Sequence, residues 1–204
     1  MDVVLPAHLS TSALVALAED ADRFTLDLRR PMPTPPALSA RRGTAFHAWV
    51  EEHYARAAFV DVDELPGSAD EGGHDADLAE LRAGFAASEW AGRTPVEVET
   101  SVETVLDGIA VRGRIDAVFE EAADDGAPSW VVVDWKTGAP PSGARAAART
   151  LQLAAYRIAW ARVRGVPVER VRGAFFHATT GETLWPDLPG LQEVTRVLRA
   201  ARPG

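Results

Sequence analysis

The sequence predicts an α/β protein in which helices flank a central mixed β-sheet. Segments with helical spacing of apolar residues and segments with strand character follow one another in the order helix, three strands, helix, strand. Two of the strand segments are joined by Asp107-Gly108, a dipeptide typical of β-hairpins. A third segment, 130–136, contains three consecutive valines, which indicates a strand covered on both faces.

Helices are predicted for most of the first 90 residues. Hydroxyl side chains at 10–12 are N-cap candidates for a helix that ends near Phe24. Residues 45–58 and 78–90 also have helical spacing, and the acidic, glycine-rich stretch 61–76 between them is expected to be a mobile loop. Four prolines predict an extended connector after the first helix, because proline disfavours helix at and before its own position: Pro31, Pro33, Pro35 and Pro36.

The second half of the chain carries the predicted sheet. Residues 96–104 alternate between Val or Thr and Glu or Ser, which is typical of a half-exposed strand, and 109–119 form the returning strand. After the strand at 130–136, glycine and proline break the chain before a long helix at 144–164. A short strand at 171–177 and a terminal helix at 191–201 complete the prediction.

Composition limits the classes of protein to consider. A chain of 204 residues with 47% apolar content is enough for one domain with its own core. The absence of Cys excludes disulfides, thiolate zinc sites and iron–sulfur clusters. No apolar run approaches the roughly 20 residues of a membrane helix, and no signal sequence is apparent, so we expect a cytoplasmic protein with no membrane partner.

The charge is unevenly distributed. The net charge is −9, but twelve acids fall in two segments, 61–80 and 120–125, which contain no Lys or Arg. Outside them 18 acids face 21 basic residues, so the overall sign does not exclude a nucleic-acid substrate. Of the basic residues 20 are Arg and one is Lys, which directs attention to Lys136.

Two acids and this lysine form the candidate catalytic group. Asp116 and Asp134 lie on neighbouring predicted strands, and a close pair of carboxylates is stable mainly when a divalent cation neutralises it. Lys136 shares a strand face with Asp134, where its ammonium can orient water or offset charge on a phosphate. Taken alone, Asp-x-Lys is more often a simple ion pair at the end of a strand.

Four further motifs give this group a context. Gly43-Thr44-x-x-His47 places an imidazole in the first turn of a predicted helix, and Gly113-x-Ile115-Asp116 precedes the first acid. The lysine stands in Asp134-Trp135-Lys136-Thr137-Gly138, and Gln152 and Tyr156 lie four apart on one helix face. With these motifs, residues 10–177 resemble the nuclease domain of the RecB family, a branch of the PD-(D/E)xK superfamily. Residues 9–42 look most like the domain fused to UvrD-type helicases of actinobacteria.

The resemblance implies a restriction-endonuclease-like fold and a site that holds Mg²⁺ or Mn²⁺. The implied metal ligands are His47, Asp116, Asp134 and the Trp135 carbonyl, and the implied catalytic residues are Asp116, Asp134 and Lys136. Residues implied to support the site or contact DNA are Gln152, Tyr156, Thr44, Arg42 and Arg114, with Glu99 a less certain addition because Glu97 and Glu103 share its strand face.

The resemblance also implies a domain plan and partners. The chain is read as one nuclease domain, 1–204, with an N-terminal helix and connector at 1–42, a catalytic core at 43–178 and a C-terminal helix at 179–204. The expected partners are DNA, with single strands favoured, and a helicase motor, for which this chain has no Walker A loop. The alternative is an inactive nuclease fold that binds DNA or acts as a scaffold in a helicase complex.

Overall fold

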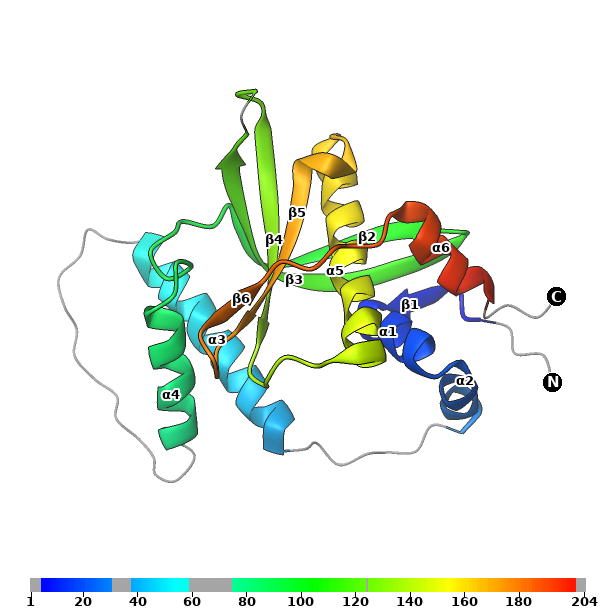
Figure 1. The fold of residues 1–204 in the computed structure, drawn as a ribbon, viewed down its shortest axis with the longest axis horizontal. Helices are drawn as coiled ribbons and strands as arrows, with labels where there is room; N and C mark the ends of the chain where they lie inside the picture. The colour runs from blue at the N-terminus through cyan, green and yellow to red at the C-terminus, as the bar shows by residue number, and fades with distance from the viewer. Residues whose placement is uncertain (1–4, 31–37, 59–74, 124, 201–204) are drawn as a thin grey trace.

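A six-stranded mixed sheet forms the centre of the protein (Figure 1). The computed structural model describes residues 5–30, 38–58, 75–123 and 125–200. The strand order is β1-β3-β4-β5-β6, with β2 paired antiparallel to β3. The pairs β1–β3 and β4–β5 are parallel, and β3–β4 and β5–β6 are antiparallel. The strands are β1 His8–Ser10, β2 Glu97–Leu106, β3 Ile109–Ala122, β4 Pro128–Lys136, β5 Val171–His177 and β6 Glu182–Leu184.

Helices cover both faces of this sheet, as the predicted fold class requires (Figure 1). They are α1 Thr11–Glu19, α2 Ala21–Arg29, α3 Leu38–Ala58, α4 Asp75–Ala86, α5 Gly143–Arg164 and α6 Leu191–Ala200, with a short 3₁₀ turn at Val168–Arg170. None of the described helices is long and apolar enough to cross a membrane.

The two faces have different cores. On one face α3 and α4 pack an aromatic cluster against the sheet, in which Phe85 of α4 contacts the rings of Phe46, Trp135 and Phe176. On the other face α5 lies across the strands, and Tyr156 and Trp160 pack there against β2, β3 and β4. The valines of β4 alternate between these two clusters, which confirms that this strand is covered on both faces.

The strand prediction agrees with the structure more closely than the helix prediction does. The predicted first helix is two helices, because Asp20 leaves helical geometry and its side chain caps α2 by accepting a hydrogen bond from the Arg23 amide at 2.8 Å. The predicted helix at 45–58 begins seven residues earlier, at Leu38, so His47 lies beyond the first turn. The predicted helix at 78–90 is α4, which starts at Asp75 and ends at Ala86.

Two predictions concern segments beyond the described residues. The proline connector at 31–36 and most of the acidic stretch at 61–76 lie outside them, and residues 75 and 76 belong to α4 rather than to a loop. Strands β1 and β6 were not predicted, since three residues are too few to show a period of two.

Candidate active site

The candidate site lies where β3 and β4 separate near the centre of the sheet (Figure 1). The register between the two strands ends at Ala117 and Val133. Asp116 and Asp134 are the next residues, so the two acids lie opposite each other where the strands part. Asp116 remains tied to β4, because its Oδ2 accepts a hydrogen bond from the Trp135 amide at 2.7 Å. Both acids are buried.

The side of the sheet on which alternate side chains of β3 pack changes at Asp116. Ile115 packs with the α5 side of the sheet, whereas Ala117 packs with the α3 side. On a regular strand residues two apart share a face, so the backbone must rotate between them. Asp116 occupies this point of rotation. Its carboxylate can therefore meet groups from both layers of the protein, and not from one layer alone.

Glu99 causes the same reversal in β2. Its φ of 50° is a left-handed conformation, uncommon for a residue other than glycine. Val98 before it packs on the α3 side and Val102 after it on the α5 side. The flanking pairs of the β2–β3 register place Glu99 opposite Asp116. The structure thus distinguishes Glu99 from Glu103, which pairs with Arg112 at the surface.

His47 approaches these acids from α3. Its Nδ1 lies 3.3 Å from Asp116 Oδ1 and 3.5 Å from Glu99 Oε1, and its Nε2 lies 3.1 Å from the Trp135 carbonyl oxygen. One possible ligand atom from each of His47, Glu99 and Asp116 lies within 4.8 Å of the other two. Three of the five ligand candidates, His47, Glu99 and Asp116, therefore converge, while the Trp135 carbonyl contacts the other ring nitrogen of His47 and Asp134 lies opposite Asp116.

The carboxylates give the cluster an excess of negative charge, which shifts the pKa values of His47 and Asp116. Burial lowers the pKa of His47, but hydrogen bonds with Asp116 and Glu99 and the charges of Asp116 and Asp134 outweigh it and raise the pKa to about 10. Burial and the charge of Asp134 raise the pKa of Asp116, against the opposing effects of His47 and the Trp135 amide. The site therefore attracts positive charge at His47 and resists negative charge at Asp116.

Lys136 belongs to a chain of side chains that runs along the α5 layer. Its Nζ lies 2.5 Å from Asp134 Oδ2 and donates to Gln152 Oε1 at 3.2 Å. Gln152 Nε2 donates to the Tyr156 hydroxyl at 3.0 Å, and Thr11 Oγ1 donates to the same hydroxyl at 3.3 Å. Burial and the charge of Asp134 raise the pKa of Tyr156 to about 12. The (i, i+4) pair on α5 thus fixes the position of Lys136.

Sequence reasoning missed Thr11 and gave no physical role to Gly113. Thr11 is one of three cap candidates in the sequence, but Ser10 is the N-cap and Thr11 is the first residue of α1. A Cβ at Gly113 would lie 2.4 Å from Tyr156 Cε1 and 2.8 Å from Thr11 Cγ2. Gly113 therefore makes room for the ring that supports the lysine chain.

The predicted DNA-contacting residues at the rim are engaged with the protein itself. Thr44 Oγ1 donates to the Ala40 carbonyl within α3. Arg42 pairs with Asp77 of α4 at 3.3 Å and donates to the Thr137 carbonyl at 3.2 Å. Arg114 Nε lies 2.7 Å from Glu99 Oε2, although 59% of its side chain is exposed. Tyr156 is 3% exposed, so its hydroxyl supports the site from inside.

A cleft of about 440 Å³ opens over the α3 side of the cluster. His47, Glu99 and Arg114 line it, together with Gly43 and Thr44 of the motif that precedes the histidine. A cation or a phosphate can therefore reach the cluster from solvent.

Comparisons with known proteins identify the family of this chain. The sequence model of the PD-(D/E)XK nuclease superfamily matches residues 8–197, and the chain belongs to this superfamily. No curated protein matches it significantly.

Solved structures also resemble this chain. One is a protein from Eubacterium rectale that is described as a proposed exonuclease. Its TM-score to this chain is 0.62 and its sequence identity is 12%, and the match covers 96% of this chain and 81% of that one. Another is SSO0001, with a TM-score of 0.42 and 13% identity over 98% and 77% of the two chains. The first likeness supports the restriction-endonuclease-like fold.

Proposed function

We propose that this chain is a divalent-metal-dependent DNA nuclease of the RecB type that hydrolyses phosphodiester bonds. The observation that carries the proposal is the convergence of His47, Glu99 and Asp116, with the Asp134–Lys136 pair beside them and a cleft above. Membership of the nuclease superfamily supports it.

The donor set suits Mg²⁺ or Mn²⁺. Carboxylate and carbonyl oxygens are the preferred ligands of these hard cations, and a single imidazole is compatible with them. His47, Asp116, Asp134 and the Trp135 carbonyl would hold the ion, and we add Glu99 because it lies in the same cluster. When bound, such an ion supplies an activated water and compensation for the charge that develops on the phosphate.

Groups of the protein itself position Asp116 and Lys136. The Trp135 amide holds Asp116, and the Gln152–Tyr156–Thr11 chain holds Lys136. From this position the Lys136 ammonium orients the attacking water and stabilises negative charge on the phosphate. Arg does not substitute easily, because its guanidinium is larger, planar and effectively never deprotonated.

Single-stranded DNA is the substrate we propose, with a helicase motor in the same polypeptide or complex as partner, in the cytoplasm and in DNA repair or recombination. These parts of the proposal rest on the resemblance of the sequence motifs to the RecB family. Outside two acidic segments the chain is slightly basic, which is compatible with a DNA substrate.

The test is cleavage of labelled single- and double-stranded DNA with Mg²⁺ or Mn²⁺ by the wild type, Asp134→Ala and Lys136→Ala. We expect single strands to be degraded by the wild type and both variants to lose about 10²-fold or more in rate. Glu103→Gln is the matched control, since this acid lies on β2 outside the cluster. Equal activity of wild type and variants would refute the catalytic assignment. DNA binding without cleavage by the wild type would support the inactive module.

A further inference from the structure

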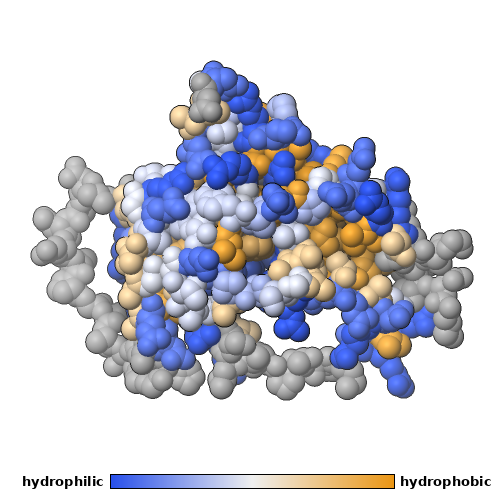
Figure 2. Space-filling view, in the orientation of Figure 1, coloured by the Kyte–Doolittle hydropathy of each residue, from blue (hydrophilic) through white to orange (hydrophobic). Residues whose placement is uncertain are grey.

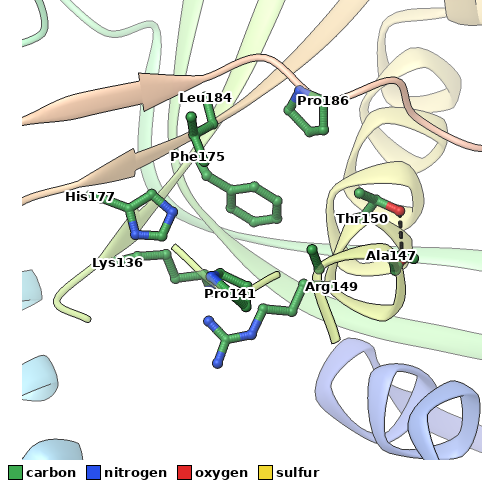
Figure 3. A pocket seen from close by; sticks show the side chains of 10 residues that line it. Lys136, Pro141, Ala147, Arg149, Thr150, Phe175, His177, Leu184 and Pro186 are labelled. Atoms are coloured by element: carbon green, nitrogen blue, oxygen red, sulfur yellow. Dashed lines mark hydrogen bonds between the residues drawn. The ribbon is translucent and has the colours of Figure 1, made fainter. Parts of the chain in front are cut away.

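A second pocket lies beside Lys136, on the α5 side of the candidate site (Figure 3). It encloses about 160 Å³ between β5, β6 and the start of α5. Phe175, Pro141, Leu184 and Pro186 form apolar walls, and Thr150 donates its hydroxyl to the Ala147 carbonyl within the helix. The pocket is therefore apolar, although it adjoins a highly charged site.

Phe175 gives this pocket an aromatic wall. Its ring lies at the centre of the view in Figure 3, and Lys136 Nζ is 5.5 Å from its centroid. An apolar cavity of about 150 Å³ takes a ligand the size of benzene. A pocket of this size and lining therefore suits one planar ring, and it places that ring next to the candidate catalytic lysine.

Positive charge borders the pocket. Lys136 and Arg149 both line it, and the Arg149 guanidinium points away from the Phe175 ring in Figure 3. Within the described residues the Arg149 side chain has no ion pair or hydrogen bond, unlike those of Arg42 and Arg114 at the other rim. Over this face of the molecule hydrophobic surface gathers around α5 and the adjoining strands, with hydrophilic surface around it (Figure 2).

An aromatic wall with a cation at the mouth matches the chemistry of a nucleotide, which joins an apolar ring to an anionic phosphate. We propose that this pocket binds one unstacked base of the DNA strand, next to the phosphate held at the catalytic site. The base stacks on Phe175 while Arg149 contacts a neighbouring phosphate. A base in a duplex is paired and stacked, so the pocket selects single strands or frayed ends. This inference rests on the proposed nuclease function.

The first test follows cleavage bond by bond with single-stranded DNA that carries one abasic residue at successive positions. We expect the abasic residue to slow cleavage about tenfold or more at one fixed distance from the cut bond. Ala146→Phe fills the pocket, so it should slow cleavage of normal DNA by a similar factor and abolish the sensitivity to the abasic residue. Ala144→Phe is the matched control on the same helix, because Ala144 is exposed and lies outside this pocket.

The second test measures binding separately from cleavage, by anisotropy of labelled natural and fully abasic oligonucleotides of equal length in EDTA. The wild type and Ala144→Phe should prefer the natural strand, and Ala146→Phe should not. Cleavage that is indifferent to every abasic position refutes the pocket and leaves the nuclease assignment intact. Preferential binding without cleavage supports the pocket and refutes the nuclease assignment. If the wild type neither cleaves DNA nor prefers the natural strand, both the pocket and the nuclease assignment are refuted.

Discussion

Gly113→Ala tests whether close packing in β3 holds Lys136, the proposed catalytic lysine, in place. The added Cβ would lie 2.4 Å from Tyr156 Cε1 and 2.9 Å from Thr11 Oγ1, where ordinary carbon contacts are about 3.5–4.0 Å. The Tyr156 ring must therefore move by about 1 Å or more. Such a movement strains its hydrogen bonds to Gln152 and Thr11, and through Gln152 it displaces Lys136.

The expected cost follows from these contacts. Overpacking in a core costs about 1–3 kcal/mol, and each weakened hydrogen bond adds about 0.5–1.5 kcal/mol. Two hydrogen bonds of the Tyr156 hydroxyl are affected, so we expect the free energy of unfolding to fall by about 2–6 kcal/mol and the melting temperature by about 4–24 °C. Urea denaturation and thermal melting measure these changes. Cleavage by the fraction that remains folded should also fall, because Lys136 is misplaced.

Two controls separate the clash from a general effect of replacing glycine. A Cβ at Gly92 meets no atom within 4 Å, so Gly92→Ala should leave stability within about 0.5 kcal/mol of wild type. In a Tyr156→Ala background the cost of Gly113→Ala should shrink, because the two residues are in contact. A Gly113→Ala variant as stable and as active as wild type would refute the reasoning.

Three further predictions concern the site directly. Mn²⁺ should raise the melting temperature of the wild type and of Glu103→Gln, and should raise that of Glu99→Gln less. Equal increases in melting temperature in the two variants would exclude Glu99 as a ligand. Lys136→Arg should cleave DNA about 10²-fold more slowly while keeping the Mn²⁺ shift, and wild-type rates from this variant would show that any cation suffices. Gln152→Ala should slow cleavage about tenfold, whereas Gln152→Glu, which keeps an acceptor for Lys136, should slow it less; equal loss in both would contradict the positioning role.

The sheet was predictable because its strands carry strong local signals. The hairpin at Asp107-Gly108 and the valines of β4 fix the neighbours and the burial of these strands without reference to the rest of the chain. The spacing of four between Gln152 and Tyr156 likewise fixes a shared helix face, and the structure joins the two by a hydrogen bond.

Other features depend on tertiary contacts that a period in the sequence does not record. Glu97, Glu99 and Glu103 share one face in a regular strand, and only the left-handed backbone at Glu99 separates them. Thr11 is 145 positions from Tyr156 in the chain, so no local pattern links them. Asp20 fits a helix by spacing, but its side chain competes for the backbone and starts a new helix.

The reversal at Glu99 and Asp116 also explains how the site brings a second acid beside Asp116, whose charged form is disfavoured by its surroundings. Burial and repulsion from Asp134 raise the pKa of Asp116, so the folded chain holds this charge less readily than water does. His47 from one layer and Lys136 from the other supply the compensating positive charge. Apolar residues in such a place are often at least as stabilising as a buried ion pair. The proposed cation site gives the grouping of Glu99 and Asp116 beside Asp134 a functional reason that the stability of the fold does not supply.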